Sequence, residues 1–196
     1  GGTPLAGILS GRLNPSGRLA MTFPLATGQV PIYYNMRSSA RINDGNYKDI
    51  SSEPLYPFGH GLSYTSFQYG EPTLSLSKLS RDQKLTVQVP VTNTGAVAGQ
   101  ETVFWFISDP ACSVSRPVKE LKFFEKKPIN PGETVVFKFV IDPMRDLSYP
   151  NFDGQKLLEA GDFSIRVKDR KVTFELVDND PASTASIPGT PANKAE

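Results

Sequence analysis

Apolar and polar residues alternate along much of the second half of the chain, with the period of two that is typical of β-strands. The alternation is clearest in four segments: 84–91, 135–141, 163–167 and 172–176. Three further segments are less regular: 73–79, 102–108 and 118–125. Asn, Pro and Gly residues with turn-forming chemistry lie between them. About seven strands at this spacing predict a mainly β fold, an immunoglobulin- or fibronectin type III-like β-sandwich over residues 71–177.

The first part of the chain shows no sustained period of either strand or helix type. Residues 1–24 contain an apolar helix end, a turn and one strand-like run that Pro24 would terminate. Because these pieces cannot bury themselves alone, they predict a piece of a larger domain. Residues 25–70 hold polar loops and an aromatic-rich run at 56–67, which predict an extended arm across a neighbouring surface. Residues 178–196, rich in Ala, Ser, Thr and Pro, predict a disordered tail.

The composition narrows the possible functions. Lys plus Arg is 21 and Asp plus Glu is 20, so the formal net charge of +1 gives no reason to expect nucleic acid or a membrane surface as a partner. No apolar run approaches membrane-spanning length. Cys112 and His60 are the only residues of their types, which excludes an internal disulfide and a multi-histidine or cysteine-based metal site, and we predict no metal and no cofactor. The chain starts at Gly1 without a signal segment, as expected of a processed product or a fragment.

A search for catalytic chemistry finds no centre in this sequence. His60 lies between two glycines without a Gly-x-Ser-x-Gly nucleophile motif, which favours a structural role in a turn. Glu120 and Glu125 flank one strand but face opposite sides of it, and the other acidic residues near loops are interpreted as solvated surface groups. Two basic clusters, at 116–127 and 166–171, are interpreted as solvated strand edges.

Several motifs stand in the order found in one enzyme family. Gly-Arg-Leu-Ala-Met-Thr-Phe-Pro occupies 17–24, Gly-Gln-Val-Pro-Ile-Tyr-Tyr-Asn occupies 28–35, and an aromatic motif containing Pro-Phe-Gly-His-Gly-Leu-Ser-Tyr occupies 54–67. The predicted sandwich adds Val-Thr-Asn-Thr-Gly at 91–95 and the basic run 113–126. Up to about residue 176, the chain resembles the C-terminal region of glycoside hydrolase family 3, most closely the bacterial periplasmic β-glucosidases, with its fibronectin type III-like domain.

The resemblance implies a domain plan and a mechanism. A TIM-like barrel and an α/β sandwich precede the fibronectin-like domain in this family, so residues 1–24 would be the last helix end and strand of the α/β sandwich. An aspartate nucleophile on the barrel forms a glycosyl-enzyme, and a second carboxylic acid protonates the leaving group. Neither residue has a counterpart here. The resemblance therefore implies a non-catalytic scaffold that stabilises the catalytic domains of a retaining β-glucosidase, inactive alone, periplasmic or secreted, with the barrel and the α/β sandwich as partners.

The aromatic residues of the arm are the predicted docking site between these domains, because aromatic side chains bury large areas. They are Tyr56, Phe58, Tyr64, Phe67 and Tyr69. The alternative is that all five belong to the core of the sandwich itself. If they face another domain, the chain alone exposes an apolar patch and is prone to dimerise. Three residues in the polar loop are candidates for the rim of the active site: Arg41, Asn43 and Tyr47.

The sandwich segment leaves some points open. Pro90 predicts that its strand is an edge strand or carries a bulge. Phe123 stands where the family commonly has glycine, so the turn geometry there is an open question. Phe104 and Trp105 predict that strand 102–108 covers the core with one face and an interdomain seam with the other. The alternative function is a stand-alone carbohydrate-binding or adhesion module, with Phe104, Trp105 and Phe106 as candidates for stacking on sugars.

Overall fold

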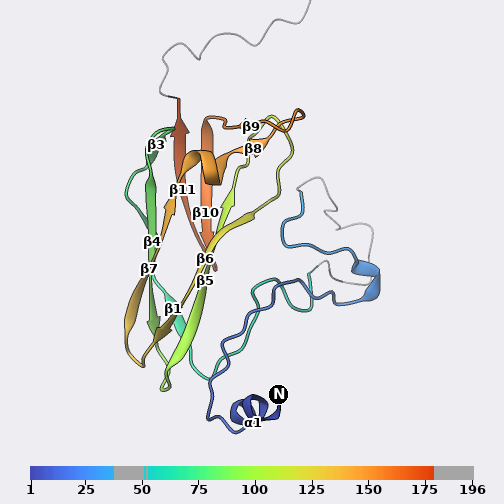
Figure 1. The fold of residues 1–196 in the computed structure, drawn as a ribbon, viewed down its shortest axis with the longest axis vertical. Helices are drawn as coiled ribbons and strands as arrows, with labels where there is room; N and C mark the ends of the chain where they lie inside the picture. The colour runs from blue at the N-terminus through green and yellow to red at the C-terminus, as the bar shows by residue number, and fades with distance from the viewer. Residues whose placement is uncertain (38–50, 52, 179–196) are drawn as a thin grey trace, which may run out of the picture.

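The structure of the chain, a computed structural model, describes residues 1–37, 51 and 53–178 (Figure 1). Two β-sheets pack face to face over residues 67–177 and form a β-sandwich. The N-terminal segments lie along one side of this sandwich and contain little regular structure. The predicted disordered tail, apart from Asp178, lies outside the described residues.

β4 (Leu85–Asn93) is the central strand of the first sheet. β7 (Thr134–Ile141) pairs along one side of β4, from Leu85 opposite Ile141 to Thr92 opposite Thr134. β1 (Phe67–Tyr69) and β2 (Thr73–Leu74) share the other side of β4. All these pairings are antiparallel.

The second sheet has the strand order β3-β11-β10-β5-β6. Its members are β3 (Lys78–Ser80), β5 (Gly99–Ser108), β6 (Glu120–Ile129), β10 (Gly161–Val167) and β11 (Arg170–Val177). β3 runs parallel to β11, whereas the other neighbours are antiparallel. This sheet presents its outer face to the N-terminal segments.

The core lies between the two sheets and follows the alternation seen in the sequence. Val87 and Val89 of β4 are fully buried, as are Phe137 of β7 and Trp105 of β5. The alternate positions of the same strands point outward, and Val136 of β7 is exposed. Each buried apolar side chain stabilises the sandwich by about 1.5–3 kcal/mol relative to full exposure. The predicted mainly β sandwich fold is confirmed.

The segment 73–79 does not form the single strand that its sequence predicts. It divides into β2, in the first sheet, and β3, in the second, because Leu74 and Leu79 pack into the core from different sheets. β1 also belongs to the sandwich, since its residues pair with Val91–Asn93 of β4. The sandwich therefore begins at Phe67 rather than at residue 71, and the arm ends at Ser66.

Pro90 lies in a central strand, which corrects the prediction of an edge or a bulge. It stands where the first sheet passes from β1 to β2, and the Gly70 nitrogen donates to the Pro90 carbonyl at 2.9 Å. The ladder on this side of β4 is interrupted at Pro90. Proline has no N–H to donate, but no carbonyl of a partner strand needs a donor at this point.

A β-bulge occupies the β5–β6 pairing at the position of the open question about Phe123. Trp105 stands opposite Phe123, whereas Phe106 stands opposite Leu121, so Lys122 is the extra residue. The Phe123 ring stacks on Phe139, with 5.2 Å between the ring centroids. The bulge thus directs the Phe123 side chain onto β7, in the other sheet. A glycine at this position would have no side chain to make the contact.

The N-terminal segments contain the helix α1 (Gly2–Leu9) and the short 3₁₀ helix η1 (Thr27–Gln29). The strand predicted before Pro24 is not formed, since Phe23 makes only an isolated β-bridge, with Tyr56. Its backbone partners within the chain are arm residues rather than a sheet. No helix of the described residues is long and apolar enough to cross a membrane.

Between β7 and β10 the chain forms a π-helical turn, η2 (Pro143–Leu147), and a small hairpin of β8 (Tyr149–Pro150) with β9 (Lys156–Leu157). Asp146 accepts a hydrogen bond from the Asp142 nitrogen at 2.8 Å and pairs with Arg145. Its side chain is buried, so the interpretation of Asp146 as a solvated surface acid is wrong. The hairpin lies at the end of the sandwich opposite α1 (Figure 1).

Candidate functional site

Segments 14–23 and 56–63 run side by side next to the sandwich, from near α1 towards η1, and we call them the linker pair (Figure 1). The Leu19 nitrogen donates to His60 O at 2.8 Å, and the Gly59 nitrogen donates to Leu19 O at 2.8 Å. Phe23 and Tyr56 exchange two further backbone hydrogen bonds, of 2.8 and 3.3 Å. These bonds satisfy backbone groups that lie outside any sheet or helix. The His60 nitrogen also donates to Pro57 O at 3.0 Å, so the backbone of His60 lies in a turn.

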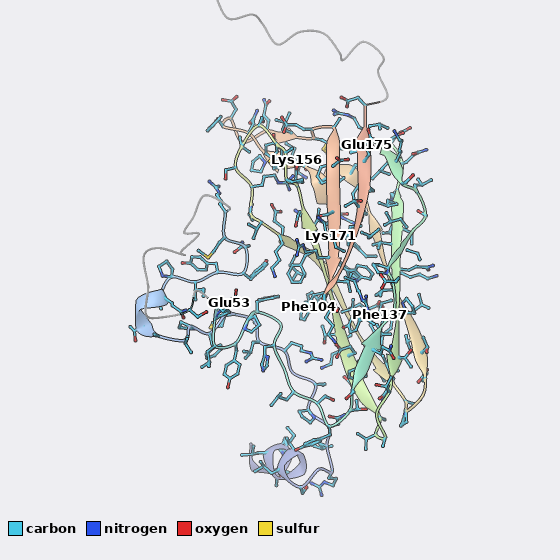
Figure 2. All side chains as sticks on the ribbon, turned by 180° about the vertical axis from the view of Figure 1, so that it is seen from behind. Glu53, Phe104, Phe137, Lys156, Lys171 and Glu175 are labelled. Carbon is cyan, nitrogen blue, oxygen red and sulfur yellow. The ribbon has the colours of Figure 1, made fainter. Side chains whose placement is uncertain are left out.

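Phe58 packs against the outer face of β5 and holds the linker pair there. Its ring stacks on Tyr34 at 4.4 Å between centroids and meets the edge of Phe104 at 5.5 Å. Figure 2 labels Phe104 at this junction. Gly59 has a φ of +82°, and a Cβ there would lie 3.3 Å from the Phe104 ring. Glycine thus permits both the turn and the close approach of the two parts.

Arg18 and Glu101 form a buried ion pair across the same junction. Their side chains are 15% and 7% exposed. Arg18 Nη1 also donates to Gly61 O at 2.9 Å, and the Tyr69 hydroxyl donates to Glu101 Oε1 at 2.7 Å. We call Arg18, Glu101 and Tyr69 the clasp. Because a buried charge needs a charged, hydrogen-bonded partner, the clasp fixes Arg18 on the sandwich.

Tyr69 is a neutral donor in this group. Burial, and in second place the charge of Glu101, raises the pKa of the Tyr69 phenol far above its ordinary value. The Lys168 amine lies 4.7 Å from the centroid of the Tyr69 ring. The carboxylate of Glu101 therefore faces a guanidinium on one side and a permanent O–H donor on the other.

Two more polar contacts join the linker pair to the sandwich. Asn14 Nδ2 donates to Ala98 O, in the β4–β5 turn, at 3.0 Å, and Asn14 Oδ1 accepts from Ser63 Oγ at 3.0 Å. Lys126 of β6 donates to Ser16 O at 3.0 Å and to Ser16 Oγ at 2.7 Å. With Phe58 and the clasp, the linker pair is held at β5, at β6 and at the β4–β5 turn.

A cavity of about 550 Å³ lies between the linker pair and β5, and we call it the junction cavity. Phe58, Phe104 and Phe106 line it together with the three clasp residues. The Lys119 amine, also in its lining, lies 5.0 Å from the centroid of the Phe106 ring. The junction cavity therefore combines aromatic walls with positive charge.

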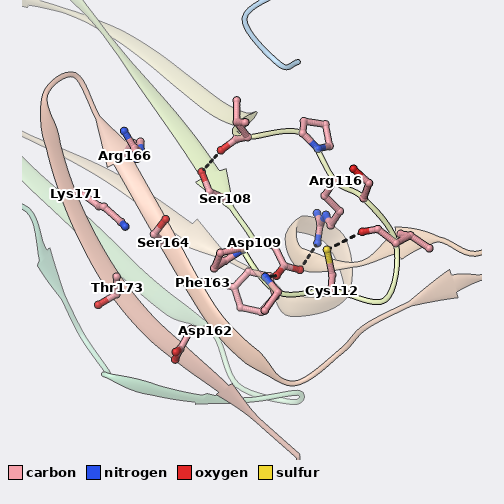
Figure 3. Close-up of a pocket in the computed structure, with 16 residues that line it drawn as sticks. Ser108, Asp109, Cys112, Arg116, Asp162, Phe163, Ser164, Arg166, Lys171 and Thr173 are labelled. Atoms are coloured by element: carbon pink, nitrogen blue, oxygen red, sulfur yellow. Dashed lines mark hydrogen bonds and ion pairs between the residues drawn. The ribbon is translucent and has the colours of Figure 1, made fainter. Parts of the chain in front are cut away.

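A second hollow, of about 680 Å³, lies between the β5–β6 loop and the β10–β11 hairpin (Figure 3), and we call it the hairpin groove. The loop is fixed by Arg116, which pairs with the buried Asp109 at 3.0 Å and donates to Leu147 O at 2.9 Å. Burial raises the pKa of Asp109, although Arg116 opposes the effect. Burial also raises the pKa of Cys112, whose thiol donates to Val114 O at 2.9 Å, so this thiol is not an activated nucleophile.

The buried carboxylates of the described residues are committed to arginine partners. Glu101 pairs with Arg18, and Asp109 pairs with Arg116. Asp146 pairs with Arg145. A retaining glycosidase needs two carboxyl groups that face one sugar, whereas each of these three is engaged in an ion pair within the chain. Over the same described residues, no group of three or more His, Cys, Asp and Glu side chains could hold a metal ion.

The structure divides the five predicted docking aromatics into two groups. Tyr69 is 7% exposed and belongs to the core, and Phe67 packs against that core, as in the alternative interpretation. Tyr56 and Tyr64 are exposed on the N-terminal side of the sandwich, and Phe58 contacts β5. Docking stays a prediction for these three. The predicted rim residues Arg41, Asn43 and Tyr47 lie outside the described residues.

The three candidates for sugar stacking do not form an exposed platform. Trp105 is fully buried in the core, and Phe106 is buried beneath the linker pair. Phe104 is half-buried and faces Phe58. Strand β5 thus covers the core with one face and the linker pair with the other.

The sequence reasoning missed the clasp and Asn14. Val103, Trp105 and Ile107 face inward at every second position of β5, and Glu101 precedes them in the same series. The period of two therefore predicts a carboxylate on the buried face of the strand. A buried carboxylate requires a partner. Nothing in the sequence identifies that partner as Arg18, which stands 83 positions earlier.

Comparisons with known proteins also separate the N-terminal segments from the sandwich. Residues 1–64 match the glycosyl hydrolase family 3 C-terminal domain, and residues 101–171 match the fibronectin type III-like domain. The chain belongs to glycoside hydrolase family 3. Within this family 3 chain the clasp connects the two matched regions, since Arg18 lies in the first and Glu101 begins the second.

Curated relatives match over most of the chain. A periplasmic β-glucosidase of Salmonella typhimurium is 40% identical over 190 residues, which cover 90% of this chain and 25% of the relative. A β-xylosidase of Formosa agariphila is 41% identical over 169 residues, 85% of this chain and 23% of the relative. The chain therefore spans about a quarter of the length of the curated relatives it matches.

Solved structures of the family contain the same arrangement. A β-glucosidase from Erythrobacter marinus superposes with a TM-score of 0.86 at 41% identity, over 90% of this chain and 24% of that one. A β-glucosidase from Listeria innocua in complex with glucose gives a TM-score of 0.80 at 35% identity, over 88% of this chain and 26% of that one. The family 3 chain described above has the fold of the C-terminal region of such enzymes.

Proposed function

We propose that this chain is the non-catalytic C-terminal part of a β-glucosidase-type glycoside hydrolase, and that its sandwich stabilises the catalytic domains. The hydrolase acts on O-glycosyl bonds by a retaining mechanism, with its aspartate nucleophile and its acid/base residue on the preceding domains. The clasp is the observation that carries the proposal. It joins a segment of the family 3 C-terminal domain to the fibronectin-like domain through a buried ion pair.

The sandwich acts through position rather than chemistry. Phe58, Arg18 and Ser16 hold the linker pair at three separate points on one sheet. A segment held at three points cannot rotate on the sheet, so the sandwich fixes the direction in which residues 1–24 leave it. In the proposed hydrolase these residues belong to the α/β sandwich domain, whose loops are then held in place beside the barrel.

Exposed apolar side chains concentrate on the part of the chain that precedes the sandwich. Leu9 is 76% exposed, and the members of the group are Leu5, Leu9, Leu13, Met21, Phe23, Leu25, Val30, Tyr33, Leu55, Tyr56, Leu62 and Tyr64. Concentrations of this kind mark interaction surfaces. We assign this one to docking against the barrel and the α/β sandwich of the same polypeptide. The chain without those domains is expected to self-associate through it.

The proposed substrates are β-glucosides or β-xylosides, and the proposed role is in carbohydrate metabolism. The names of the Salmonella and Formosa relatives support this class. The periplasmic relative supports a periplasmic or secreted location. The choice of sugar belongs to the preceding domains, because the buried carboxylates of the described residues pair with arginines.

Removal of the sandwich from the longer hydrolase tests the proposal. A variant that ends at Ser66 is expected to give less folded protein and an unfolding temperature lower by about 5 °C or more, because a loss of roughly 2 kcal/mol shifts the midpoint of a large domain by several degrees. Differential scanning fluorimetry and hydrolysis of 4-nitrophenyl β-glucoside measure the two effects. Unchanged unfolding and unchanged hydrolysis would overturn the stabilising role.

The isolated chain provides the complementary experiments. Residues 1–196 are expected to release no 4-nitrophenol from the same substrate, and turnover by this chain would refute the non-catalytic role. Calorimetry with gluco-oligosaccharides tests the carbohydrate-binding alternative. We expect no heat of binding, because Trp105 and Phe106 are covered.

A further inference from the structure

Three positive charges lie on the outer face of the second sheet, and a fourth lies in the turn between β10 and β11. Lys171 of β11 stands directly opposite Arg166 of β10, and Arg166 stands directly opposite Phe106 of β5. The Lys119 amine lies over the Phe106 ring, and Lys168 follows β10 in the turn to β11, with its amine 4.7 Å from the centroid of the Tyr69 ring. We call Lys119, Arg166, Lys168 and Lys171 the cationic row.

The members of the cationic row have no acidic partner among the described residues. None of the ion pairs within the described ranges includes one of them. Neighbouring cations are paired, as Arg170 is with Glu71 at 2.7 Å. Asp162 lines the hairpin groove on the same face as Arg166, but it stands four residues away on β10, about 13 Å along the strand. Figure 3 shows it at the other end of the hairpin from Arg166 and Lys171.

This arrangement is unfavourable for the chain by itself. Like charges directly opposite each other on adjacent strands destabilise a sheet. Burial lowers the pKa of Lys119, and the charge of Arg166 adds to that effect, so the folded chain disfavours the ammonium form. A local conflict of this kind within an otherwise consistent fold is expected where a partner binds.

The cationic row adjoins the contacts that the preceding segments already make with the sandwich. Phe106, which shares its register, is contacted by Phe58 at 6.2 Å and by Tyr34 at 5.8 Å between centroids. Arg37 forms an isolated bridge with Pro117, on the rim of the hairpin groove. Lys119 and Lys168 line the junction cavity, whereas Arg166 and Lys171 line the hairpin groove. The cationic row therefore lies next to the surface of the second sheet that the N-terminal segments already contact.

We propose that the cationic row is a docking surface for an acidic patch of Asp and Glu side chains on the part of the family 3 protein that precedes this chain. The inference rests on the proposed function, because it requires that preceding part. The relatives are about four times as long as this chain, which leaves ample polypeptide to supply the patch. A sugar is disfavoured as the occupant, since the aromatic residue that lines the hairpin groove, Phe163, is buried in the core.

The substitution Lys171→Glu should change the unfolding temperature in opposite directions in the chain 1–196 and in the longer protein. In the chain 1–196, Lys171→Glu replaces a like-charge pair with an attractive pair opposite Arg166. The unfolding temperature should rise by about 1–3 °C. In the longer protein the same substitution faces the acidic patch, and the unfolding temperature should fall by a similar or larger amount. High salt should shrink the fall, because exposed charges are screened within about 3 Å at 1 M ionic strength.

Lys138→Glu is the matched control. Lys138 lies on the outer face of the other sheet, opposite the neutral Gln88, and its substitution should shift both proteins equally. If Lys171→Glu changes the unfolding temperature in the same direction in both settings, the row faces solvent and the proposal is overturned. If 10 mM citrate stabilises both proteins and Lys171→Glu abolishes that effect in both, the row binds a free anion instead, which also overturns the proposal. Because the readout is unfolding, a longer protein without β-glycosidase activity would contradict the proposed function and leave this test intact.

Discussion

At the scale of single residues, the contact between the linker pair and the sandwich depends on a carboxylate whose partner comes from a distant segment. Glu101 is on the inward series of β5, and Arg18 reaches it from the linker pair. Removing one member of a buried ion pair leaves an uncompensated charge, which is far more damaging than the loss of an exposed pair. The clasp is therefore the place where one substitution separates the linker pair from the sandwich.

Arg18→Met tests this dependence. It should lower the free energy of unfolding by about 3 kcal/mol, because Glu101 keeps its burial but loses its cation. Urea unfolding followed by the fluorescence of Trp105, the single tryptophan of the chain, measures the loss. Glu71→Gln, which removes the exposed pair with Arg170, is the control and should change stability by less than about 1 kcal/mol. Equal effects of the two substitutions would contradict the role of the clasp.

Tyr69 sets a limit at alkaline pH. Burial raises the pKa of its phenol above the ordinary value of 10.0, so the folded chain keeps a proton that the unfolded chain releases. Stability from this group is fully present below pH 10 and is lost as the pH rises further, by up to about 1.4 kcal/mol per pH unit. In Tyr69→Phe this loss is absent. The difference in urea midpoint between wild type and Tyr69→Phe should therefore shrink from pH 9 to pH 11, and a constant difference would exclude the effect.

At the scale of elements, the linker pair and the sandwich differ in how they are stabilised. The strands of the sandwich bury a shared core, whereas the linker pair relies on a few contacts with β5, β6 and one turn. Elements with few buried contacts open locally at a lower free energy than the core does. Phe58 makes the aromatic contacts of the linker pair with Phe104 and Phe106, so it governs that opening.

Phe58→Ala should release the linker pair while the sandwich stays folded. Losing about 1.4 kcal/mol or more of local contact energy should speed proteolytic cleavage within residues 53–66 at least tenfold. The thermal transition of Trp105 fluorescence should move by only a few degrees. Phe152→Ala, at the tip of the β8–β9 hairpin where Phe152 is 98% exposed, is the matched control and should change neither readout. Equal cleavage rates in the two variants would show that Phe58 does not hold the linker pair.

At the scale of the whole molecule, one domain of the chain has its own core and the remainder depends on other surfaces. The buried cluster draws on both sheets and, among the residues that the structure describes, includes none before Tyr69. The exposed apolar group lies before Phe67, on the side that the proposed catalytic domains would cover.

Residues 67–178 alone are therefore expected to fold. The shortened chain should unfold in one cooperative transition, with emission typical of a buried tryptophan at 25 °C. Its unfolding temperature should lie several degrees below that of the full chain, because Glu101 exchanges Arg18 for water. An emission spectrum typical of solvent-exposed tryptophan would mean that the sandwich requires the linker pair to fold.

The sequence by itself determined the strands with regular alternation and the residues of their core. β4, β7, β10 and β11 follow the period of two closely, because the direction of a side chain from a strand is a local property of the backbone. The motifs at 17–24 and 54–67 likewise indicate the family, because each is a continuous run of residues that can be recognised without its tertiary contacts.

Only the tertiary structure decided which distant residues meet. It divided 73–79 between two sheets, placed Pro90 where the ladder is interrupted, and brought Arg18 to Glu101. It also set Lys171 opposite Arg166 and left the cationic row without acidic partners among the described residues. None of these follows from a local period, because each depends on the register and packing of segments far apart in the chain.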